Sequence, residues 1–344
     1  MNHFVFPPSV PFAFLLFAVW SGAALMVAGA IRLGVLDHPG HRSSHTRPTP
    51  KGGGIGVVTA FVLAVPAARL LHGLPMLTPA VAGLLAATIL LGGVSWLDDV
   101  YQWPPSLKLA AQFAASILVV ATGPHPTGIA MPIGGAVLSV GVLVFMTNAV
   151  NFMDGLNGLA SGSILLACLV IGGLASGGAD RAGLGDMALI LAAALAGFLP
   201  FNFPAARIFM GDVGSQSCGL LMGAFGLAGA AGGTGGGLGL AVPLLMAGLL
   251  YDVGYTLLRR WRNGARLVES HREHLYQLAT QAGMSPVVVT LVQWAFVLWG
   301  GVAALLMQQG RTGPAGALVL VLLPQLGWTG IVRGRIRRMP PRDA

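Results

Sequence analysis

Charged residues are scarce in this chain: aspartate, glutamate, lysine and arginine together make up 9% of its 344 residues, and only two of them are lysines. Hydrophobic residues make up 55%, and the mean hydropathy is +0.78. Soluble globular domains carry about a quarter charged residues, so this composition excludes that class. The formal net charge of +8 does not indicate nucleic-acid binding, because no soluble domain is visible to present a basic face. We expect an integral membrane protein without a nucleic-acid partner.

Cysteine is almost absent as well. Cys168 and Cys218 both lie inside apolar runs, and neither belongs to a CxxC or histidine-rich pattern. Both are expected to be small buried hydrophobic residues rather than parts of a redox centre or a zinc site. The chain also lacks a basic segment before its first apolar run, so that run is expected to remain as a membrane span.

Long apolar runs, by contrast, recur along the whole chain. With about 20 apolar residues for each crossing, and with shorter glycine-interrupted spans allowed, eleven candidate helices emerge. Ten is the alternative count, because short glycine- and proline-rich segments merge in hydropathy. The sequence therefore predicts an all-α, polytopic membrane protein of about 10 or 11 helices, with one integral membrane domain over residues 1–344. The candidate segments lie near residues 12–31, 53–71, 77–97, 108–123, 133–150, 158–176, 186–202, 214–231, 238–258, 286–307 and 313–332.

The basic residues predict the orientation of these segments. All lysines and arginines except Arg69, Arg181 and Arg311 fall on one side, which the positive-inside rule assigns to the cytoplasm. The N-terminus is therefore expected outside and the C-terminus inside, with residues 333–344 as a basic cytoplasmic tail near anionic headgroups. Most acidic residues share that side, so we expect the polar chemistry at the cytoplasmic face of the inner membrane.

An acidic pair ends the third candidate segment, in the stretch GGVSWLDDVYQWPP. Asp98 and Asp99 lie near a membrane boundary, where adjacent carboxylates repel one another unless a cation compensates them. A solvated helix end before the Pro-Pro turn explains the pair equally well. Lys108 follows ten residues after Asp98, and its position alone is equally consistent with a positive-inside anchor.

Polar side chains recur at helical spacing in NAVNFMDGLNG, at the inner end of the fifth segment. Asn148, Asn151 and Asp154 are three residues apart, so on a helix they form one polar stripe. Asn157 continues the spacing, but the two glycines of this stretch are expected to open the helix there. Helix capping explains one such residue and not four, because unpaired polar groups at this depth are costly.

A second acidic motif, RIFMGDVGSQSCG, precedes the eighth segment. Gly211 and Gly214 flank Asp212 and are expected to let the backbone approach a ligand closely. Carboxylate oxygens suit hard cations, so Asp212 is predicted to be a magnesium ligand. Ser215 is either part of this site or simply the cap of the following helix.

Two loops on the same side carry cations. The loop RRWRNGARLVESHREHLYQLA is either a solvated basic loop facing lipid or an anion clamp for a phosphate or sugar phosphate. Asp252 lies just before this loop and is expected to pair with one of its arginines. The first inner loop ends in TPKGGG, which is expected to bring Lys51 and backbone N–H groups to the level of the acids, unless it is only a connection.

Five motifs in order across residues 48–277 resemble those of the polyprenyl-phosphate N-acetylhexosamine-1-phosphate transferases. They read TPKGGG, WLDD, NAVNFMDGLNGLA, GDVGS and HREHLYQ. The resemblance implies a membrane glycosyltransferase of family 4 that moves an N-acetyl-amino-sugar-1-phosphate from a UDP-sugar to undecaprenyl phosphate or another polyprenyl phosphate. Magnesium, with manganese as the alternative ion, would support the transfer, and UMP would be released. A homodimer is also compatible with this family.

The resemblance also implies roles for particular residues. Asn151 and Asp212 match magnesium ligands, and Asp98 and Asp99 match the pair that activates or positions the lipid phosphate. Asn148 and Asp154 are expected to support the site. Lys108 matches a residue that holds the diphosphate, and Asn157 matches one that contacts the uracil. His271, Arg272 and His274 lie in the loop associated with the donor. Lys51 is expected to complete the substrate-binding set.

The loop sequence separates two branches of the family. The branch that acts on the muramyl-pentapeptide donor carries consecutive histidines and often an aspartate at the position of Asn157, whereas this loop reads SHREHLYQ. The chain therefore resembles more closely the branch that initiates O-antigen and related surface polysaccharides. The muramyl-pentapeptide branch stays as one alternative. A transporter for an anionic substrate is the other, although transporters usually place polar residues near the membrane midplane in inverted repeats.

Overall fold

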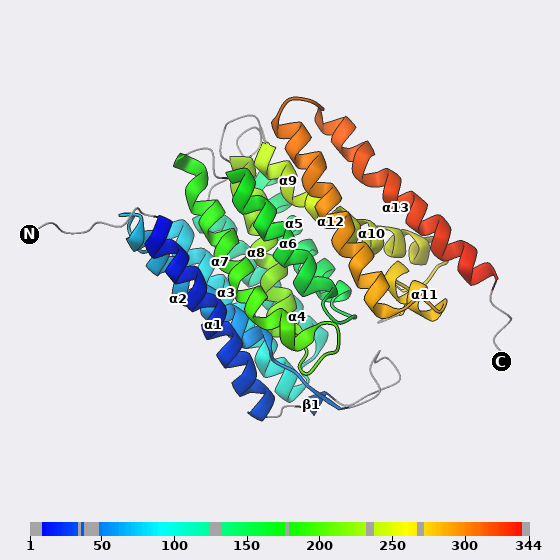
Figure 1. Ribbon diagram of the computed structural model, residues 1–344, viewed down its shortest axis with the longest axis horizontal. Coiled ribbons are helices and arrows are strands. Elements are labelled where there is room, and N and C mark those ends of the chain that lie inside the picture. The colour runs from blue at the N-terminus through cyan, green and yellow to red at the C-terminus, as the bar shows by residue number, and fades with distance from the viewer. Residues whose placement is uncertain are drawn as a thin grey trace, which may run out of the picture.

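The computed structural model describes residues 9–33, 36–37, 48–123, 132–175, 179–231, 237–266 and 272–338. Long helices run side by side and form one bundle (Figure 1). This architecture suits so apolar a chain, because a helix satisfies its own backbone hydrogen bonds where water is absent. The helices are α1 Ser9–Leu33, α2 Gly54–Leu71, α3 Pro79–Tyr101, α4 Pro105–Thr122, α5 Pro132–Met153, α6 Leu159–Ala175, α7 Ala179–Asn202, α8 Gly211–Ala231, α9 Gly237–Leu245, α10 Ala247–Arg262, α11 Leu275–Gln281, α12 Pro286–Gln308 and α13 Pro314–Arg337.

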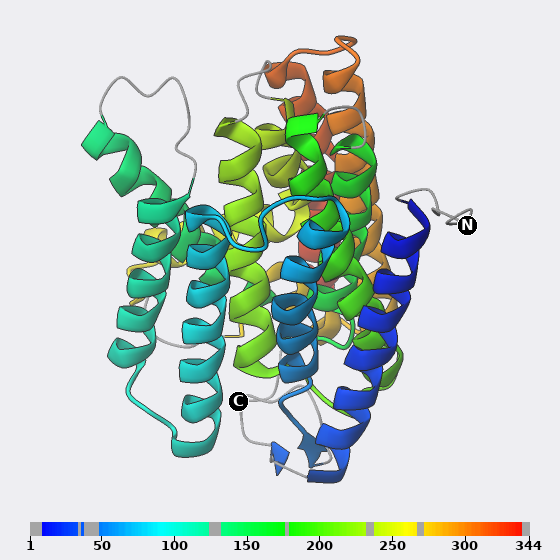
Figure 2. The same cartoon turned by 90° about the vertical axis from the view of Figure 1, so that its left-hand side faces the viewer.

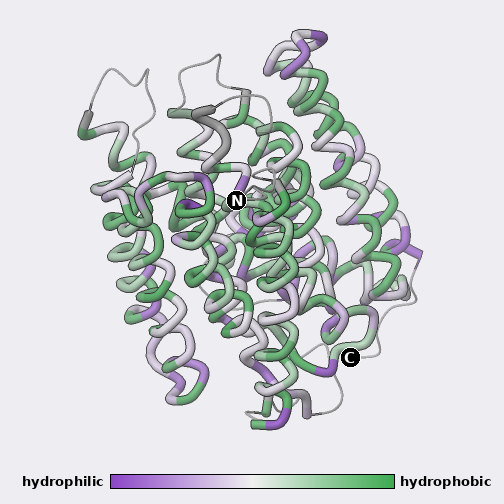
Figure 3. The backbone as a smooth tube through the Cα atoms, turned by 60° about the vertical axis from the view of Figure 1, so that its left-hand side comes forward, coloured by the Kyte–Doolittle hydropathy of each residue, from purple (hydrophilic) through white to green (hydrophobic). Residues whose placement is uncertain are grey.

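The all-α, polytopic membrane architecture is confirmed. Among the described residues, eight helices are long and apolar enough to cross a membrane, and the bent pair α9 and α10 makes a ninth. The other two predicted segments are also helices, but α6 has only 17 residues and α8 begins with the polar run DVGSQS. Hydrophobic residues cover most of the helices, and hydrophilic ones lie mainly towards their ends (Figure 3).

The ninth predicted segment is not one straight helix. It breaks at Met246, and α9 and α10 are inclined at 62°. Pro243 lies just before the break and cannot donate a backbone hydrogen bond, which weakens the helix at this point. Helix α10 consequently leaves the direction of the bundle and crosses towards α13 (Figure 1).

The chain ends of several helices meet at one end of the bundle, which we call the site end. Helices α2, α4 and α8 begin there, and α3, α5 and α13 end there. The short antiparallel pair β1 Leu36–Asp37 and β2 Thr49–Pro50 lies at the same end, close to the α3–α4 connection (Figure 2). The two motifs that carry acids and the motif that carries asparagines are therefore brought to one level.

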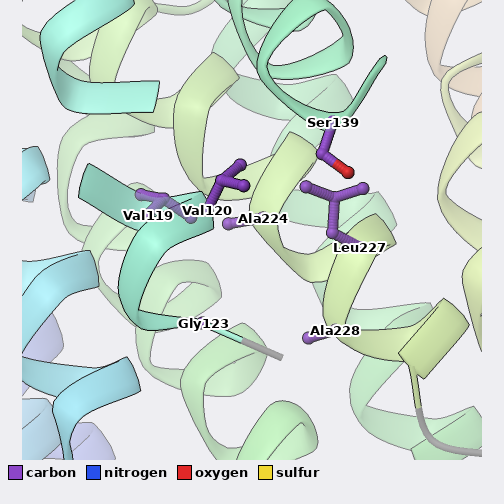
Figure 4. Close-up of a pocket in the computed structure, with 7 residues that line it drawn as sticks. All are labelled: Val119, Val120, Gly123, Ser139, Ala224, Leu227 and Ala228. Atoms are coloured by element: carbon purple, nitrogen blue, oxygen red, sulfur yellow. The ribbon is translucent and has the colours of Figure 1, made fainter. Parts of the chain in front are cut away.

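A small gap between α4, α5 and α8 lies among the described residues towards the opposite end of the bundle. Its lining is apolar apart from Ser139 (Figure 4). Its volume of about 20 Å³ has room for about one water molecule. This gap is far too small for a sugar nucleotide or a lipid.

Small residues let the helices of the site end pack closely. A methyl group added at Gly54 of α2 would lie 2.3 Å from Cα of Gly214 in α8. Gly214 was expected to admit a ligand to the backbone; the structure instead uses it for this helix contact. Such close approaches drive association inside membranes, where helices gain nothing from leaving a hydrocarbon solvent.

The Gly54 contact predicts the effect of one added methyl group. Gly54→Ala should destabilise the protein by about 1–3 kcal/mol, because the backbone of α8 has no room to move away. Thermal unfolding in detergent measures the effect. Gly93→Ala in α3 is the matched control, since a methyl group there meets nothing within 4 Å. Equal unfolding temperatures for the two variants would contradict the proposed tight contact.

Candidate active site

Lys108 lies at the centre of a charged network that joins three helices. Its ammonium group, at the start of α4, is 2.5 Å from Oδ2 of Asp98 in α3 and 3.0 Å from Oδ2 of Asp212 in α8. Asp98 is buried, whereas Lys108 and Asp212 are half-buried. The structure thus brings together residues that are more than 100 positions apart in the sequence.

Lys51 forms the third ion pair of this network, with 3.0 Å between its ammonium nitrogen and Oδ1 of Asp99. The segment before α2 is held by backbone bonds from Phe209 N to Pro50 O and from Gly53 N to Phe209 O. The prediction that TPKGGG brings a cation to the acids is confirmed. The N–H groups of Gly53 and Gly54 are occupied by backbone carbonyls, however, so these two are not available to bind an anion.

Gly211 shapes the backbone next to these acids. Its φ is +72°, a left-handed conformation that glycine adopts without strain. A methyl group there would lie 3.1 Å from Oδ2 of Asp99. The glycine before Asp212 therefore brings the start of α8 against the carboxylate of Asp99.

Asn151 connects the end of α5 to the same network. Its amide nitrogen donates to Oδ1 of Asp212 and to the hydroxyl of Ser215, both at 2.9 Å. Ser215 was considered as a helix cap, but α8 begins at Gly211, and its hydroxyl donates back to that residue's carbonyl. Gln216 donates to Oδ2 of Asp212 at 3.0 Å. Asp212 therefore accepts from a lysine and two amides.

A cluster of amide side chains supports these contacts. Asn148 and Gln112 exchange hydrogen bonds through both amide atoms, and Gln112 also donates to Gln216 at 3.1 Å. The supporting position predicted for Asn148 agrees with these contacts. Gln112 and Gln216 were not identified from the sequence, although a glutamine inside an apolar helix was a usable signal.

The turn after α5 holds the remaining residues of the asparagine motif. The helix ends at Met153, and Gly158 adopts a positive φ of 72°, so the glycines open the helix as predicted. Asn157 donates to the carbonyl of Pro204, away from the acidic network. Desolvation raises the pKa of Asp154 well above its usual range, and the Asp212 carboxylate raises it further.

Asn202 is a residue that sequence reasoning missed. It is buried at the end of α7, accepts from the backbone N–H of Gly158 at 2.7 Å and donates to the carbonyl of Ile208. It therefore joins the turn after α5 to the connection before α8. A lone asparagine at the end of a hydrophobic run was the available signal.

A buried carboxylate in α10 holds the short helix α11. Asp252 accepts from His274 Nδ1 at 3.1 Å and from the backbone N–H groups of Leu275 and Tyr276, both at 2.9 Å. The expected pairing of Asp252 with an arginine is wrong. The bend at Met246 turns α10 so that Asp252 meets the start of α11 instead.

Tyr276 carries this connection on to α5. Its hydroxyl donates to the carbonyl of Phe152 at 3.0 Å, and Gly155 leaves the space that the ring needs. Burial raises the pKa of Tyr276, and the Asp252 carboxylate adds to the effect, so the hydroxyl remains a donor. Helix α11 is thus fixed to the turn that follows Asn151.

The predicted donor-binding loop is divided between two environments. His274 is 4% exposed and contacts Asp252, so it is enclosed rather than open to a ligand. Arg272 is exposed, and its carbonyl accepts from Gln281. His271 lies outside the described residues. The arginines before the loop pair with Glu273, at 2.8 Å for Arg259 and 3.0 Å for Arg260.

The acidic network has features that suit a hard cation. Oδ1 of Asp98 and Oδ2 of Asp99 are buried without a hydrogen-bond partner in the described part of the chain. The carboxylates of Asp98, Asp99 and Asp212 face two ammonium groups, which leaves a formal charge of 2 − 3 = −1. Within the described ranges no three His, Cys, Asp or Glu side chains form a complete metal site. The donor set therefore fits a cation whose remaining ligands come from amides, water or substrate phosphate.

The contacts of Asp252 predict that its charge orders α11. Asp252→Asn should raise the hydrogen-exchange rate of the backbone amides of residues 272–281 by at least tenfold. An amide side chain cannot accept all three N–H bonds that the carboxylate accepts. Each of these bonds contributes about 1.5–3 kcal/mol when the acceptor is charged. Hydrogen–deuterium exchange with mass spectrometry measures this. Asp186→Asn, which alters the carboxylate paired with His72, is the control. Unchanged exchange in the Asp252 variant would show that other contacts hold α11.

Comparison with known proteins places these motifs in a wider group. Residues 81–230 match the family described as "Glycosyl transferase family 4". The chain is 32% identical to a decaprenyl-phosphate N-acetylglucosaminephosphotransferase of Mycobacterium tuberculosis, over 80% of this chain and 75% of that protein. It is 26% identical to a probable undecaprenyl-phosphate N-acetylglucosaminyl 1-phosphate transferase of Bacillus subtilis, over 86% and 83%. A phospho-N-acetylmuramoyl-pentapeptide-transferase of Streptococcus thermophilus is 31% identical over 50% of this chain and 53% of its own.

Proposed function

The chain belongs to glycosyl transferase family 4 and is a membrane-bound sugar-phosphate transferase, and we propose that it transfers an N-acetyl-amino-sugar-1-phosphate from a UDP-sugar to a polyprenyl phosphate. N-acetylglucosamine is the first donor sugar to consider, because it is the sugar named for relatives that align over most of their length. The transporter alternative lacks support, since the polar network lies at one end of the bundle and not at its middle.

The observation that carries this proposal is the Lys108 network. One ammonium group contacts carboxylates from two other helices, and two further carboxylate oxygens beside it lack partners among the described residues. Phosphoryl transfer between two anionic substrates requires compensated charge and aligned groups more than covalent help from the protein. The network offers both positive charge and oxygen ligands at one level.

The proposed reaction is a direct displacement. An oxygen of the polyprenyl phosphate forms a bond to the β-phosphorus of the donor, and the bond from that phosphorus to the bridging oxygen breaks. UMP leaves with this oxygen, and the lipid carries a diphosphate sugar. Lys108 neutralises the donor diphosphate, and the half-buried ammonium of Lys51 is placed to do the same beside Asp99.

Asp98 and Asp99 are each paired with a different lysine. Lys108 occupies Oδ2 of Asp98 and Lys51 occupies Oδ1 of Asp99, so one oxygen of each carboxylate remains for a ligand. Asp98 would orient the acceptor phosphate or accept its proton. A route through an aspartyl-phosphosugar on Asp98 is the mechanistic alternative. Single-turnover trapping of such an adduct would contradict direct attack.

Magnesium is the ion proposed for this site. Asp212 and the amide oxygen of Asn151 would hold it. The ion would supply further positive charge to the phosphoryl oxygens. Asn157, which reaches the α7–α8 connection, is proposed to contact the uracil, and Arg272 the donor's diphosphate or sugar.

The location and pathway are also part of the proposal. The site end carries nearly all described basic residues, which favours its placement at the cytoplasmic face of the inner membrane. Initiation of O-antigen or a related surface polysaccharide fits the loop sequence SHREHLYQ better than the muramyl-pentapeptide reaction does.

A panel of donors tests the proposed reaction directly. Purified protein with polyprenyl phosphate and magnesium should release UMP from a UDP-N-acetylhexosamine, and omission of the lipid phosphate should abolish release. Chromatographic detection of UMP measures the reaction. The muramyl-pentapeptide donor should be inactive. If no UDP-sugar of the panel supports UMP release, the proposed function is wrong.

A variant of Asn151 tests the proposed metal site separately from folding. Asn151→Ala should lower magnesium-dependent UMP release by at least about 100-fold, as expected when an oriented group at a metal site is lost. Titration of activity with magnesium, and thermal unfolding to show a folded protein, measure the two effects. Gln309→Ala, an exposed amide outside the site, is the control. Wild-type magnesium dependence in the Asn151 variant would remove this residue from the metal site.

A further inference from the structure

A second polar feature lies at the site end, between α10 and α13. It is a groove with a volume of about 360 Å³, and none of the residues of the Lys108 network lines it. A hydrogen bond of 3.0 Å between Tyr251 Oη and Thr329 Oγ1 joins the two helices. Beyond these two residues α10 continues for about three turns and α13 for about two, and the groove lies along these last turns.

Four arginines line the groove. Arg259 and Arg262 come from α10, and Arg333 and Arg337 come from α13, each pair at a spacing that keeps both residues on one helix face. The side chains of Arg262, Arg333 and Arg337 make no hydrogen bond or ion pair with any described residue. Two helices therefore direct uncompensated positive charge to one place.

Arg259 differs from the other three arginines of the groove because it is already paired. Its Nη2 donates to the side chain and the carbonyl of Glu273, but its Nε is buried without a partner within the described chain. Glu273 also pairs with Arg260, so it cannot neutralise the other arginines of the groove.

Apolar side chains complete the lining. Leu258 and Ile336 are 45% and 36% exposed, and Tyr255 and Leu278 line the same space. A soluble phosphate or nucleotide would satisfy the arginines but leave these side chains uncovered. A ligand with an anionic head and a hydrocarbon body matches both parts of the lining.

We propose that this groove binds an anionic phospholipid of the surrounding bilayer. The headgroup phosphate accepts from Arg262, Arg333 and Arg337, and the first part of an acyl chain lies along Leu258 and Ile336. Guanidinium groups suit phosphate because their planar N–H groups donate in pairs. The inference takes from the proposed function only that the site end faces the cytoplasmic leaflet, which carries anionic lipid.

Native mass spectrometry of the purified full-length protein tests this inference. Phosphatidylglycerol and phosphatidylcholine with the same acyl chains are titrated, and the Kd of the first adduct is measured for each. Wild-type protein should bind phosphatidylglycerol more tightly. Arg333→Gln with Arg337→Gln should raise its Kd by at least roughly fivefold, because one arginine near an anionic surface contributes about that factor.

The matched control lies on the same helix. Arg335→Gln with Arg338→Gln removes the same charge, but neither residue lines the groove, so the Kd should stay within twofold of wild type. Should the first double variant fail to fold, Arg262→Gln on α10 provides the same measurement. The binding readout does not use catalysis, so failure here is distinguishable from failure of the proposed transferase reaction.

Four results would overturn the proposal. Equal Kd values for the two lipids would show no recognition of the headgroup. Equal losses in the two double variants would show general attraction to a basic end and no site. Displacement of phosphatidylglycerol by millimolar inorganic phosphate would indicate a site for soluble phosphate. Displacement by equimolar polyprenyl phosphate would identify the acceptor lipid as the occupant.

Discussion

The contact between one ammonium group and carboxylates from two other helices is the interaction on which the site end depends. Lys108, Asp98 and Asp212 come from three helices, and each would be an uncompensated charge near hydrocarbon without the others. Charge compensation therefore fixes how the end of α3 and the starts of α4 and α8 lie relative to one another. The contacts that form the candidate site are thus also the contacts that position these three helices.

Two different kinds of contact hold the two halves of the site. Around Lys108 the contacts are ionic and partly open to ligand, whereas around Asp252 they are buried and satisfied by backbone N–H groups. The halves meet at α5, where Asn151 contacts Asp212 and the carbonyl of Phe152 accepts from Tyr276. Adjacent residues of one helix end thus connect the acidic network to the loop that resembles a donor-binding loop.

The sequence allowed prediction of the helical segments, their shared polar end and the grouping of Lys51 with the acids, because hydropathy and charge are local properties. It did not reveal the break at Met246 or the helix α11, which has only seven residues. The partner of Asp252 was therefore wrong, since partner choice depends on where the bend sends α10. Asn202 and Gln112 were missed because a single amide has no periodicity, and its partner lies far away in the sequence.

The arginines of the site end look alike in the sequence but have different contacts in the structure. Hydropathy analysis treats all of them as markers of orientation. In the structure Arg259 and Arg260 hold Glu273 and so fix the segment before α11. Arg333 and Arg337 contact no acidic side chain of the described chain and face a partly apolar groove. A paired arginine orders the protein, whereas an unpaired one beside exposed hydrocarbon is available to the bilayer. The proposed lipid site would therefore use the same kind of positive charge from which the orientation is predicted.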